Sequence, residues 1–381
     1  FDVMPQPLQF HHVTAFTLVV LCYQLLDVRM VFQPHMWHGV EQRTGPYFEG
    51  WYFKVVSSDR QNVLAVINGV SIAPKGSEQD SHAFVFATIN GGETQYYRYP
   101  VSEYSATRNP NWLQYKMGPN VFGEYDMQLN LVPKDGDDAS LSISGTLQFS
   151  HLVRWPIQWH SPGPMGYFGW FSFLQCYHHV VSMDHDVEGS ITVGKDKIDF
   201  NGGKGYTDKD WGTRFPTDWI WLQSNHFEDS PGSSLFFSLA RVPFHFTTIP
   251  GFTCGFFFEP DQRIYRFATY NQARIQTLDL EGGLMRIVMN NKRYQLELEV
   301  QRSSEYAYLY GPRHGQMVKH IPETLKASVH VTLWDLDSGK AIFSGESSPA
   351  GLEVVEEQAG GLEWLKRKLR VVSSDALRQA V

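Results

Sequence analysis

The stretch Gly202–Asn225 limits what this chain can fold into more than any other segment. It opens on glycines, which tolerate positive φ, runs through charged and aromatic residues, and passes Pro216 into an alternating strand. The period of two puts four side chains on one face of that strand: Trp219, Trp221, Gln223 and Asn225. Buried indole and amide groups each need a hydrogen-bond partner, which is unusual for a plain core. This face therefore indicates the lining of a cavity.

The composition indicates an all-β chain. Of 381 residues, 42% are hydrophobic and 14% aromatic, and 32 glycines with 20 prolines supply many turns. The formal net charge of −8 argues against nucleic acid or an anionic membrane surface as the main partner, because both attract basic surfaces. Three widely spaced cysteines fit neither a disulfide framework nor a zinc knuckle, so we expect free thiols.

Hairpin signals recur along the first half of the chain. The turn Asn90–Gly92 separates two alternating runs, and similar turns separate the others. We expect paired strands over Phe48–Val56 and Asn62–Val70, Ala83–Ile89 and Gln95–Tyr99, Tyr125–Val132 and Ser140–Phe149, and Gly189–Val193 and Lys197–Asn201. The irregular stretch Trp155–Trp170, rich in Pro, Gly and aromatic residues, is expected to cover an apolar surface.

The stretch Cys176–Asp186 contains three histidines and two aspartates, a composition that invites a metal site. Successive strand residues face opposite sides, so His178 and His179 diverge, and no helical His-x-x-x-His spacing is present. We therefore predict hydrogen-bonded core or rim histidines and no metal.

Three patterns of the first half return in the same order in the second. The echoes pair Pro46–Phe53 with Pro216–Trp221, Tyr96–Pro100 with Ile264–Ala268, and Gly189–Phe200 with Ser328–Phe343. They predict a duplicated β unit, with two barrel or sandwich halves over residues 37–215 and 216–357 joined near Arg214–Thr217.

The two ends of the chain are predicted to lie outside these halves. Residues 1–36 are expected to be a leader that is processed or poorly ordered, and its apolar run Val13–Leu26 is too short and interrupted for a membrane span. Residues 358–381 are expected to be a tail with one amphipathic helix over Gly361–Ala380, either a surface helix or a contact with a membrane or lipid droplet. The compartment, plastid or cytoplasmic and membrane-peripheral, and the oligomeric state stay open.

Several separated blocks resemble the tocopherol cyclase family, in particular its bacterial-type members. They are Phe48–Lys54, Asp80–Phe84, Ser161–Gly163, Lys209–Asn225 and Gly351–Glu353, and the resemblance spans about residues 37–353. It implies a lipocalin-like fold of two β-barrel halves. It also implies an enzyme of vitamin E biosynthesis that closes a chromanol ring from a prenylated hydroquinone without a cofactor. Plant cyclases show Lys-Asn-Trp-Gly where this chain has Lys209–Gly212.

Such chemistry needs a proton donor for an alkene, aromatic faces for the resulting cation, and an acceptor for the phenol proton. Glu49 and Asp210 are the candidate acids, and Lys209 and Trp211 are expected to shape the surroundings of Asp210. We predict Asp210 as the donor, because a loop before the strand can present it to a barrel mouth. The predicted substrate-binding residues are Trp51, Tyr52, Asp80, His82, Trp211, Trp219, Trp221, Gln223, Asn225 and His226.

Structural alternatives exist for each of these charged residues. Lys209 and Asp210 could be an ion pair at the joint between the halves, and Glu49 could cap backbone N–H groups. If the side chains of Lys209 and Asp210 meet, the Asp210 pKa falls and Glu49 becomes the better acid, whereas strand alternation would separate them. At the level of the protein, the alternatives are a carrier for isoprenoid lipids and an enzyme that hydrates an isoprenoid alkene.

Overall fold

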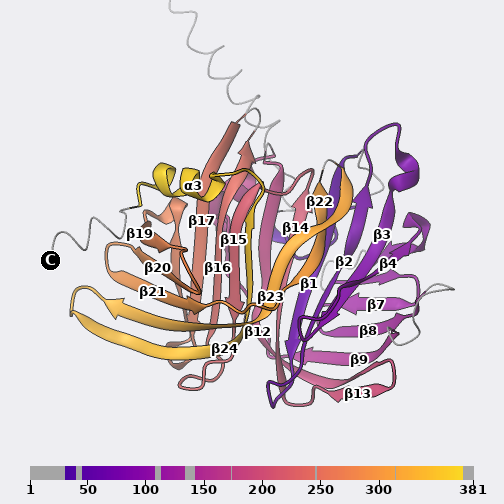
Figure 1. The fold of residues 1–381 in the computed structure, drawn as a ribbon, viewed down its shortest axis with the longest axis horizontal. Helices are drawn as coiled ribbons and strands as arrows, with labels where there is room; N and C mark the ends of the chain where they lie inside the picture. Colours follow the sequence, from indigo (N-terminus) through magenta and orange to yellow (C-terminus); the bar gives the residue numbers. More distant parts are fainter. Residues whose placement is uncertain are drawn as a thin grey trace, which may run out of the picture.

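The computed structural model describes residues 31–39, 45–107, 113–133, 142–172, 174–244, 247–313 and 315–371. Within these ranges the chain forms two large antiparallel sheets that lie side by side and a short C-terminal helix (Figure 1). The predicted all-β architecture of two lipocalin-like halves is therefore confirmed. No helix in the described ranges is long and apolar enough to cross a membrane.

The first sheet is built from residues 47–212. Its strand order is β4-β3-β2-β1-β14-β12-β9-β8-β7-β6-β5, with β13 paired to β12. The bounds are β1 Tyr47–Val56, β2 Val63–Ile72, β3 His82–Ile89, β4 Gln95–Tyr99, β5 Tyr104–Ala106, β6 Gln114–Met117, β7 Asn120–Gly123, β8 Asp126–Leu131, β9 Ile143–Ser150, β12 Cys176–Val193, β13 Asp196–Asp199 and β14 Gly203–Gly212. The strand pairs expected from the hairpin signals form at these places, with bounds that shift by a few residues.

The second sheet is built from residues 218–356. Its strand order is β18-β17-β16-β15-β24-β23-β21-β20-β19, with β22 paired to β23. The bounds are β15 Asp218–Ser224, β16 Ser234–Phe244, β17 Thr247–Phe258, β18 Arg263–Ala268, β19 Arg274–Asp279, β20 Leu284–Asn290, β21 Tyr294–Gln301, β22 Ala307–Arg313, β23 Gln316–Asp335 and β24 Lys340–Glu356, followed by helix α3 Gly361–Leu369. Short 3-10 helices η2, η3, η5, η6 and η7 cover Glu78–Asp80, Val101–Glu103, Gly166–Trp170, Glu259–Asp261 and Thr269–Asn271.

The two sheets have corresponding strand orders. In each, the first four strands of the half form a consecutive ladder, and the first of them also pairs with the last long strand: β1 with β14, and β15 with β24. Two of the echoed sequence patterns fall on corresponding strands: Pro46 directly precedes β1 and Pro216 precedes β15, while the Tyr/Arg pattern falls on β4 and β18. The internal duplication is thus visible in the topology.

Each half surrounds an apolar core of its own, and a third core lies between them. Strand alternation divides the residues: on β1, Trp51 and Phe53 enter the first core, whereas Tyr52 enters the core between the halves. On β15, Ile220 and Leu222 enter the second core, while Trp219 and Trp221 face the first half. The aromatic face that the sequence singled out therefore lies at the junction of the two sheets.

Two segments reach across this junction in opposite directions. The hairpin of β22 and β23 contacts β2 and β3, and the Tyr310 ring lies 4.3 Å from Tyr96 between centroids. The stretch 155–172, which contains β10 Ile157–Gln158, β11 Ser161–Pro162 and η5, reaches the second half, where Trp155 packs edge-on against Phe236. This stretch covers an apolar surface, as predicted.

The ends of the described chain lie against the two halves. Helix α3 buries Leu362 and Leu365 on the second half and stops at Leu369, where Arg370 adopts a positive φ. The helix is shorter than the predicted span Gly361–Ala380, and residues 372–380 of that span lie outside the described part. Residues 31–36, which fall in the predicted leader, pack on the first half, while residues 1–30, with the run Val13–Leu26 and Cys22, are outside the described ranges. Cys176 and Cys254 are buried free thiols.

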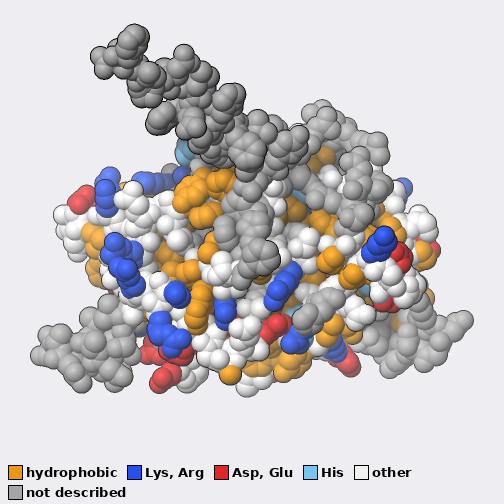
Figure 2. All heavy atoms as spheres, turned by 90° about the horizontal axis from the view of Figure 1, so that it is seen from above, with side chains coloured by type: hydrophobic (Ala, Val, Ile, Leu, Met, Phe, Trp, Pro, Cys, Tyr) orange, Lys and Arg blue, Asp and Glu red, His pale blue; other side chains and the backbone are white. Residues whose placement is uncertain are grey.

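The surface carries charges of both signs. On the face seen in Figure 2, basic and acidic side chains lie scattered among uncharged and hydrophobic ones.

Candidate functional site

A cavity of about 220 Å³ lies between the two halves. Strands β1, β2, β3, β12 and β14 of the first half and β15, β16, β17 and β24 of the second contribute to its walls, together with the stretch around η5, helix η7 and the β22–β23 hairpin. Its lining is mostly apolar and aromatic, including Phe86, Met165, Phe168, Leu309, Tyr310 and Ile321. An apolar cavity with a few convergent polar groups is the usual form of a small-molecule site.

The carboxyl groups that line this cavity come from equivalent strands of the two halves. On β14, alternation directs Tyr206, Asp208 and Asp210 toward the junction and Lys209 toward the first core. On β24, Glu353 lines the cavity directly opposite Trp221 of β15 in the strand register.

Three carboxyl groups at the junction, those of Asp208, Glu323 and Glu353, have surroundings that favour their protonated form. Burial raises the pKa of Asp208 to about 7, and its Oδ2 accepts a hydrogen bond of 2.9 Å from Tyr206. Burial also raises the pKa of Glu323 to about 7, and its Oε1 accepts a hydrogen bond of 2.7 Å from the Tyr52 hydroxyl. The pKa of Glu353 lies well above its ordinary value, first because of burial and then because of Glu323, its neighbour across β23 and β24.

The Glu353 side chain is held in place by a hydrogen bond and also borders the cavity. Its Oε2 accepts a hydrogen bond of 2.6 Å from the Trp219 indole, and the side chain borders the cavity. A carboxyl group that keeps its proton near neutral pH beside aromatic rings can act as a general acid.

His178 and Asp210 form a pair in the wall of the same cavity. The His178 Nδ1 lies 3.0 Å from Asp210 Oδ1, its Nε2 lies 3.9 Å from Asp208 Oδ2, and its ring stacks on Phe236 at 5.1 Å. Burial lowers the pKa of His178, but the nearby carboxyl groups of Asp210 and Asp208 together outweigh burial, so the pKa is raised overall. The Nε2 atom is buried and has no hydrogen-bond partner within the described residues.

Glu49 and Lys209, two of the predicted catalytic residues, lie elsewhere. Both side chains are fully buried in the first core, where Lys209 Nζ is 2.6 Å from Glu49 Oε1 and donates to the carbonyl of Pro34 at 3.0 Å. Its ammonium also lies 4.8 Å from the Trp51 ring and 4.9 Å from the Trp211 ring.

The expectation that Glu49, Lys209 and Asp210 converge is therefore corrected. Lys209 and Asp210 are neighbours in a regular strand and face opposite sides of the sheet, so they neither pair nor share an environment. The ion pair that does form joins Lys209 to Glu49, and Trp51 and Trp211 belong to it rather than to the cavity.

Asp80 and His82 lie behind the cavity wall. The ring of His82 contacts the Asp80 carbonyl and the Tyr96 hydroxyl, each at 2.6 Å, and Tyr96 in turn packs on Tyr310. The Asp80 carboxylate lies 3.4 Å from the Gln316 side chain at the molecular edge. These contacts fix the wall without reaching the cavity.

Only the first part of the predicted cavity face of β15 lines the cavity, because the strand extends beyond it. Tyr52, Trp219 and Trp221 line the cavity, but Asn225 is six residues beyond Trp219, about 20 Å along an extended chain. Gln223 instead accepts a hydrogen bond of 2.9 Å from the buried Lys54 ammonium. His226 is buried at the same end of the junction.

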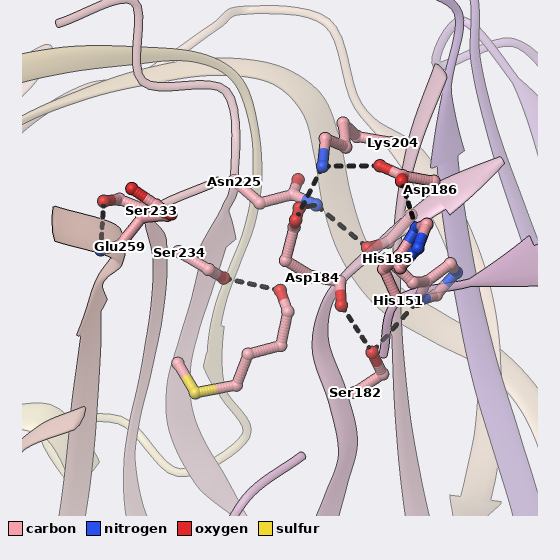
Figure 3. A network of polar contacts seen from close by, with 12 residues as sticks. His151, Ser182, Asp184, His185, Asp186, Lys204, Asn225, Ser233, Ser234 and Glu259 are labelled. Carbon is pink, nitrogen blue, oxygen red and sulfur yellow. Dashed lines mark hydrogen bonds and ion pairs between the residues drawn. The ribbon is translucent and has the colours of Figure 1, made fainter. Parts of the chain in front are cut away.

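Asn225 joins a network that ties the halves together away from the cavity (Figure 3). It donates to Asp184 Oδ1 at 2.8 Å, and Lys204 bridges Asp184 and Asp186 at 2.9 and 2.7 Å. His151 completes the network at the surface with a contact of 2.7 Å to Asp186. This network is built as a structural joint.

Sequence reasoning missed His178, Asp208, Glu323 and Glu353 as functional residues. A signal was available for Glu323, because it shares one strand face with Ile321 and Leu325, and an acid on an apolar face calls for a special environment. Asp208 shares its face with Asp210 at a spacing of two. Neither pattern shows that these residues meet, because they come from different halves.

The fold and the site together define a class: a double β-barrel protein with an acid-lined apolar cavity between its halves. Comparisons with known proteins give the family. The profile of the tocopherol cyclase-like family matches residues 136–356, more than half of the sequence, and the chain belongs to this family. Membership supports an enzyme of a cyclase or hydratase type.

Individual relatives are distant. The chain is 21% identical to a chloroplastic tocopherol cyclase from Zea mays over 387 residues, covering 88% of this chain and 79% of the maize protein. Among solved structures, it is similar to CghA in complex with Sch210972, with a TM-score of 0.51 and 11% identity over 82% of this chain and 89% of CghA. That likeness concerns the fold.

Proposed function

We propose that this protein closes a chromanol ring from a prenylated hydroquinone, the reaction of a tocopherol cyclase. The observation that carries the proposal is the Glu353 carboxyl group, held by Trp219 and kept protonated by burial at the edge of an apolar cavity, with Asp208 in the facing half. Such a reaction would belong to vitamin E biosynthesis, and its substrate would be a phytyl-type or other isoprenoid hydroquinone.

In the proposed reaction, Glu353 gives its proton to the less substituted carbon of the prenyl alkene, and the π electrons form the new C–H bond. The tertiary cation that results faces the rings of Trp219 and Trp221, whose π faces attract positive charge. A phenol oxygen attacks the cation and forms the C–O bond. Its proton passes to the Asp208 carboxylate and returns from there to Glu353, so the reaction is a net isomerisation.

The acid and the base of this scheme have different surroundings. Burial raises the pKa of Asp208 to about 7, so a large share is ionised near neutral pH. The pKa of Glu353 lies well above its ordinary value because of burial and of the neighbouring Glu323. Asp210, the donor predicted from the sequence, has one carboxyl oxygen 3.0 Å from His178 Nδ1, so that oxygen already has a partner in the cavity wall. We therefore assign the donor role to Glu353.

The experiment is incubation of the full chain with a phytyl hydroquinone, followed by chromatography and mass spectrometry. A chromanol of unchanged mass supports the proposal, and a product heavier by one water identifies an isoprenoid hydratase, which shares the protonation step. Binding without conversion identifies a lipid carrier. Glu353→Gln, Asp210→Asn and Glu49→Gln, each checked for melting temperature and ligand binding, identify the donor: only the donor variant loses turnover while still binding.

A further inference from the structure

The strongest unassigned feature of the molecule is the imidazole of His178. It lies in the cavity wall on β12, opposite Asp210 in the register of β12 and β14, and stacks nearly parallel on Phe236 with an interplanar angle of 12°. Asp210 Oδ1 at 3.0 Å from Nδ1 and the Phe236 face fix the ring from two sides. The ring is therefore held in one orientation with Nε2 as its remaining polar atom.

The Nε2 atom has no hydrogen-bond partner in the described chain, and the nearest carboxylate oxygen, Asp208 Oδ2, is 3.9 Å away. This separation is too long for a direct hydrogen bond, which for nitrogen and oxygen ends near 3.2 Å. It suits a single oxygen atom between the two groups, since about 2.8 Å to each is compatible with a gap of this size. A buried donor without an acceptor is costly, so an oxygen that fills the gap gains free energy.

We propose that His178 and Asp208 form the subsite for the reacting phenolic hydroxyl of the ligand, with Asp210 as the positioning residue for His178. In this subsite Nε2–H donates to the ligand oxygen, and the ligand O–H donates to Asp208. The proposal rests on the proposed function and deepens it, because it assigns the head of the hydroquinone to one side of the cavity and leaves its alkene near Glu353.

The subsite requires a hydroxyl group rather than any oxygen. A methyl ether at the same position has no O–H to donate to Asp208, and its added methyl group does not fit the 3.9 Å gap, so the ether oxygen is also displaced from Nε2 and makes neither hydrogen bond. The arrangement also explains how the attacking oxygen is deprotonated, because the proton that leaves it as the C–O bond forms already lies on the path to Asp208.

The test uses binding alone, with ligands that cannot react. Two saturated-tail ligands, a hydroquinone and its methyl ether at the reacting oxygen, are titrated against the full chain by calorimetry or tryptophan fluorescence. We expect the hydroquinone to bind about 10- to 100-fold more tightly, the range for hydrogen bonds to a charged group. In His178→Phe this preference falls by about tenfold while affinity for the ether is unchanged, and Asp210→Asn shows a smaller loss of preference.

The matched control is His179→Phe, the adjacent residue, which faces away from the cavity and leaves the preference unchanged. Equal binding of the two ligands by the wild-type chain overturns the subsite and leaves the cyclase proposal standing, and this measurement needs no variant. A preference that survives in a folded His178→Phe protein also overturns it. Failure to bind either ligand overturns the proposed function itself, and the subsite with it.

Discussion

The two halves of this molecule share one strand order but fill their interiors with different chemistry. The first encloses the buried pair of Glu49 and Lys209 among its aromatic residues. The described core of the second is apolar and includes Ile220, Leu222 and Leu352. Either kind of interior can be filled by the barrel's own side chains, so the cavity forms between the halves and not inside one of them.

Each half has a buried acid at the start of its first strand that binds a backbone N–H group. Glu49 at the start of β1 accepts a hydrogen bond of 3.0 Å from the His38 N–H, and Asp218 at the start of β15 accepts one of 3.2 Å from the Gln358 N–H. Each acid thus fastens a segment from one end of the chain across its own half. The partner cations differ, because Lys209 is fully buried whereas Arg241, 3.5 Å from Asp218, keeps 19% of its side chain exposed.

The comparison shows that the duplicated halves place functional groups at their junction. The equivalent strands β14 and β24 each send an acidic side chain, Asp208 or Glu353, to the junction rather than to an interior. The two acids meet different neighbours, since Tyr206 binds one and Trp219 binds the other. Symmetry of fold therefore gives a site with an asymmetric acid and base.

The largest expected effect comes from removing the acid supplied by the second half. Glu353→Gln keeps the hydrogen bond from Trp219 but removes the transferable proton, so turnover of a phytyl hydroquinone falls by about 10²–10⁴-fold. Initial rates at saturating substrate measure the loss, with unchanged ligand binding and melting temperature as controls. Near-normal turnover in a folded Glu353→Gln protein would show that Glu353 of the second half is not the proton donor.

The buried ion pair of the first half is expected to dominate its stability. Lys209→Met leaves Glu49 buried and uncompensated, which costs about 3–5 kcal/mol in the free energy of unfolding. Denaturant titration checks the value. The double variant Glu49→Gln with Lys209→Met is the matched comparison and recovers most of the loss, because no lone charge remains; equal losses in both proteins would contradict an ion-pair origin.

The dependence of kcat/KM on pH sharpens the division of roles. Only the carboxylate of Asp208 accepts a proton, and burial raises its pKa to about 7, so activity is present above pH 7 and falls about tenfold per unit below it. Burial raises the pKa of Glu353 well above its ordinary value, which favours the protonated acid as the pH falls through this window. His178 lowers the pKa of Asp208, and His178→Phe therefore moves the acid limb to higher pH. A flat profile between pH 5 and about 7 would assign the base elsewhere.

The smallest effect is expected at the anchor of the second half. Arg241→Met removes an ion pair that water partly screens and the contact of the guanidinium with the Trp364 ring at 4.5 Å. The unfolding free energy should fall by about 1 kcal/mol, well below the loss in Lys209→Met. A loss comparable to that of Lys209→Met would show that the two anchors are equivalent despite their different exposure.

Much of the fold was within reach of sequence patterns. Alternation and turn residues located the strands from β1 to β4, and the echo of Pro46 by Pro216 identified β1 and β15 as equivalent. The same alternation placed Trp219 and Trp221 on one face, which lines the cavity. The helix at the C-terminus ended earlier than its periodicity indicated, at Arg370, because a positive φ there closes the last turn.

The candidate site was only partly within reach. Asp210 lines the cavity, but it does so from within strand β14 and not from the loop that was predicted. Lys209 was assigned to it because the two are adjacent, and strand alternation separates their side chains. The amide face of β15 extended past the cavity, so Asn225 became part of a joint with Asp184.

The sequence by itself determined the local quantities: which segments are strands, which side chains share a face, and that the unit is repeated. These depend on periods of two and on turn chemistry, which act between residues a few positions apart. Only the tertiary structure decided which faces meet. Asp208 and Glu353 are joined by the packing of two separate sheets, and the burial that raises both pKa values exists only after the halves dock, so no local pattern records it.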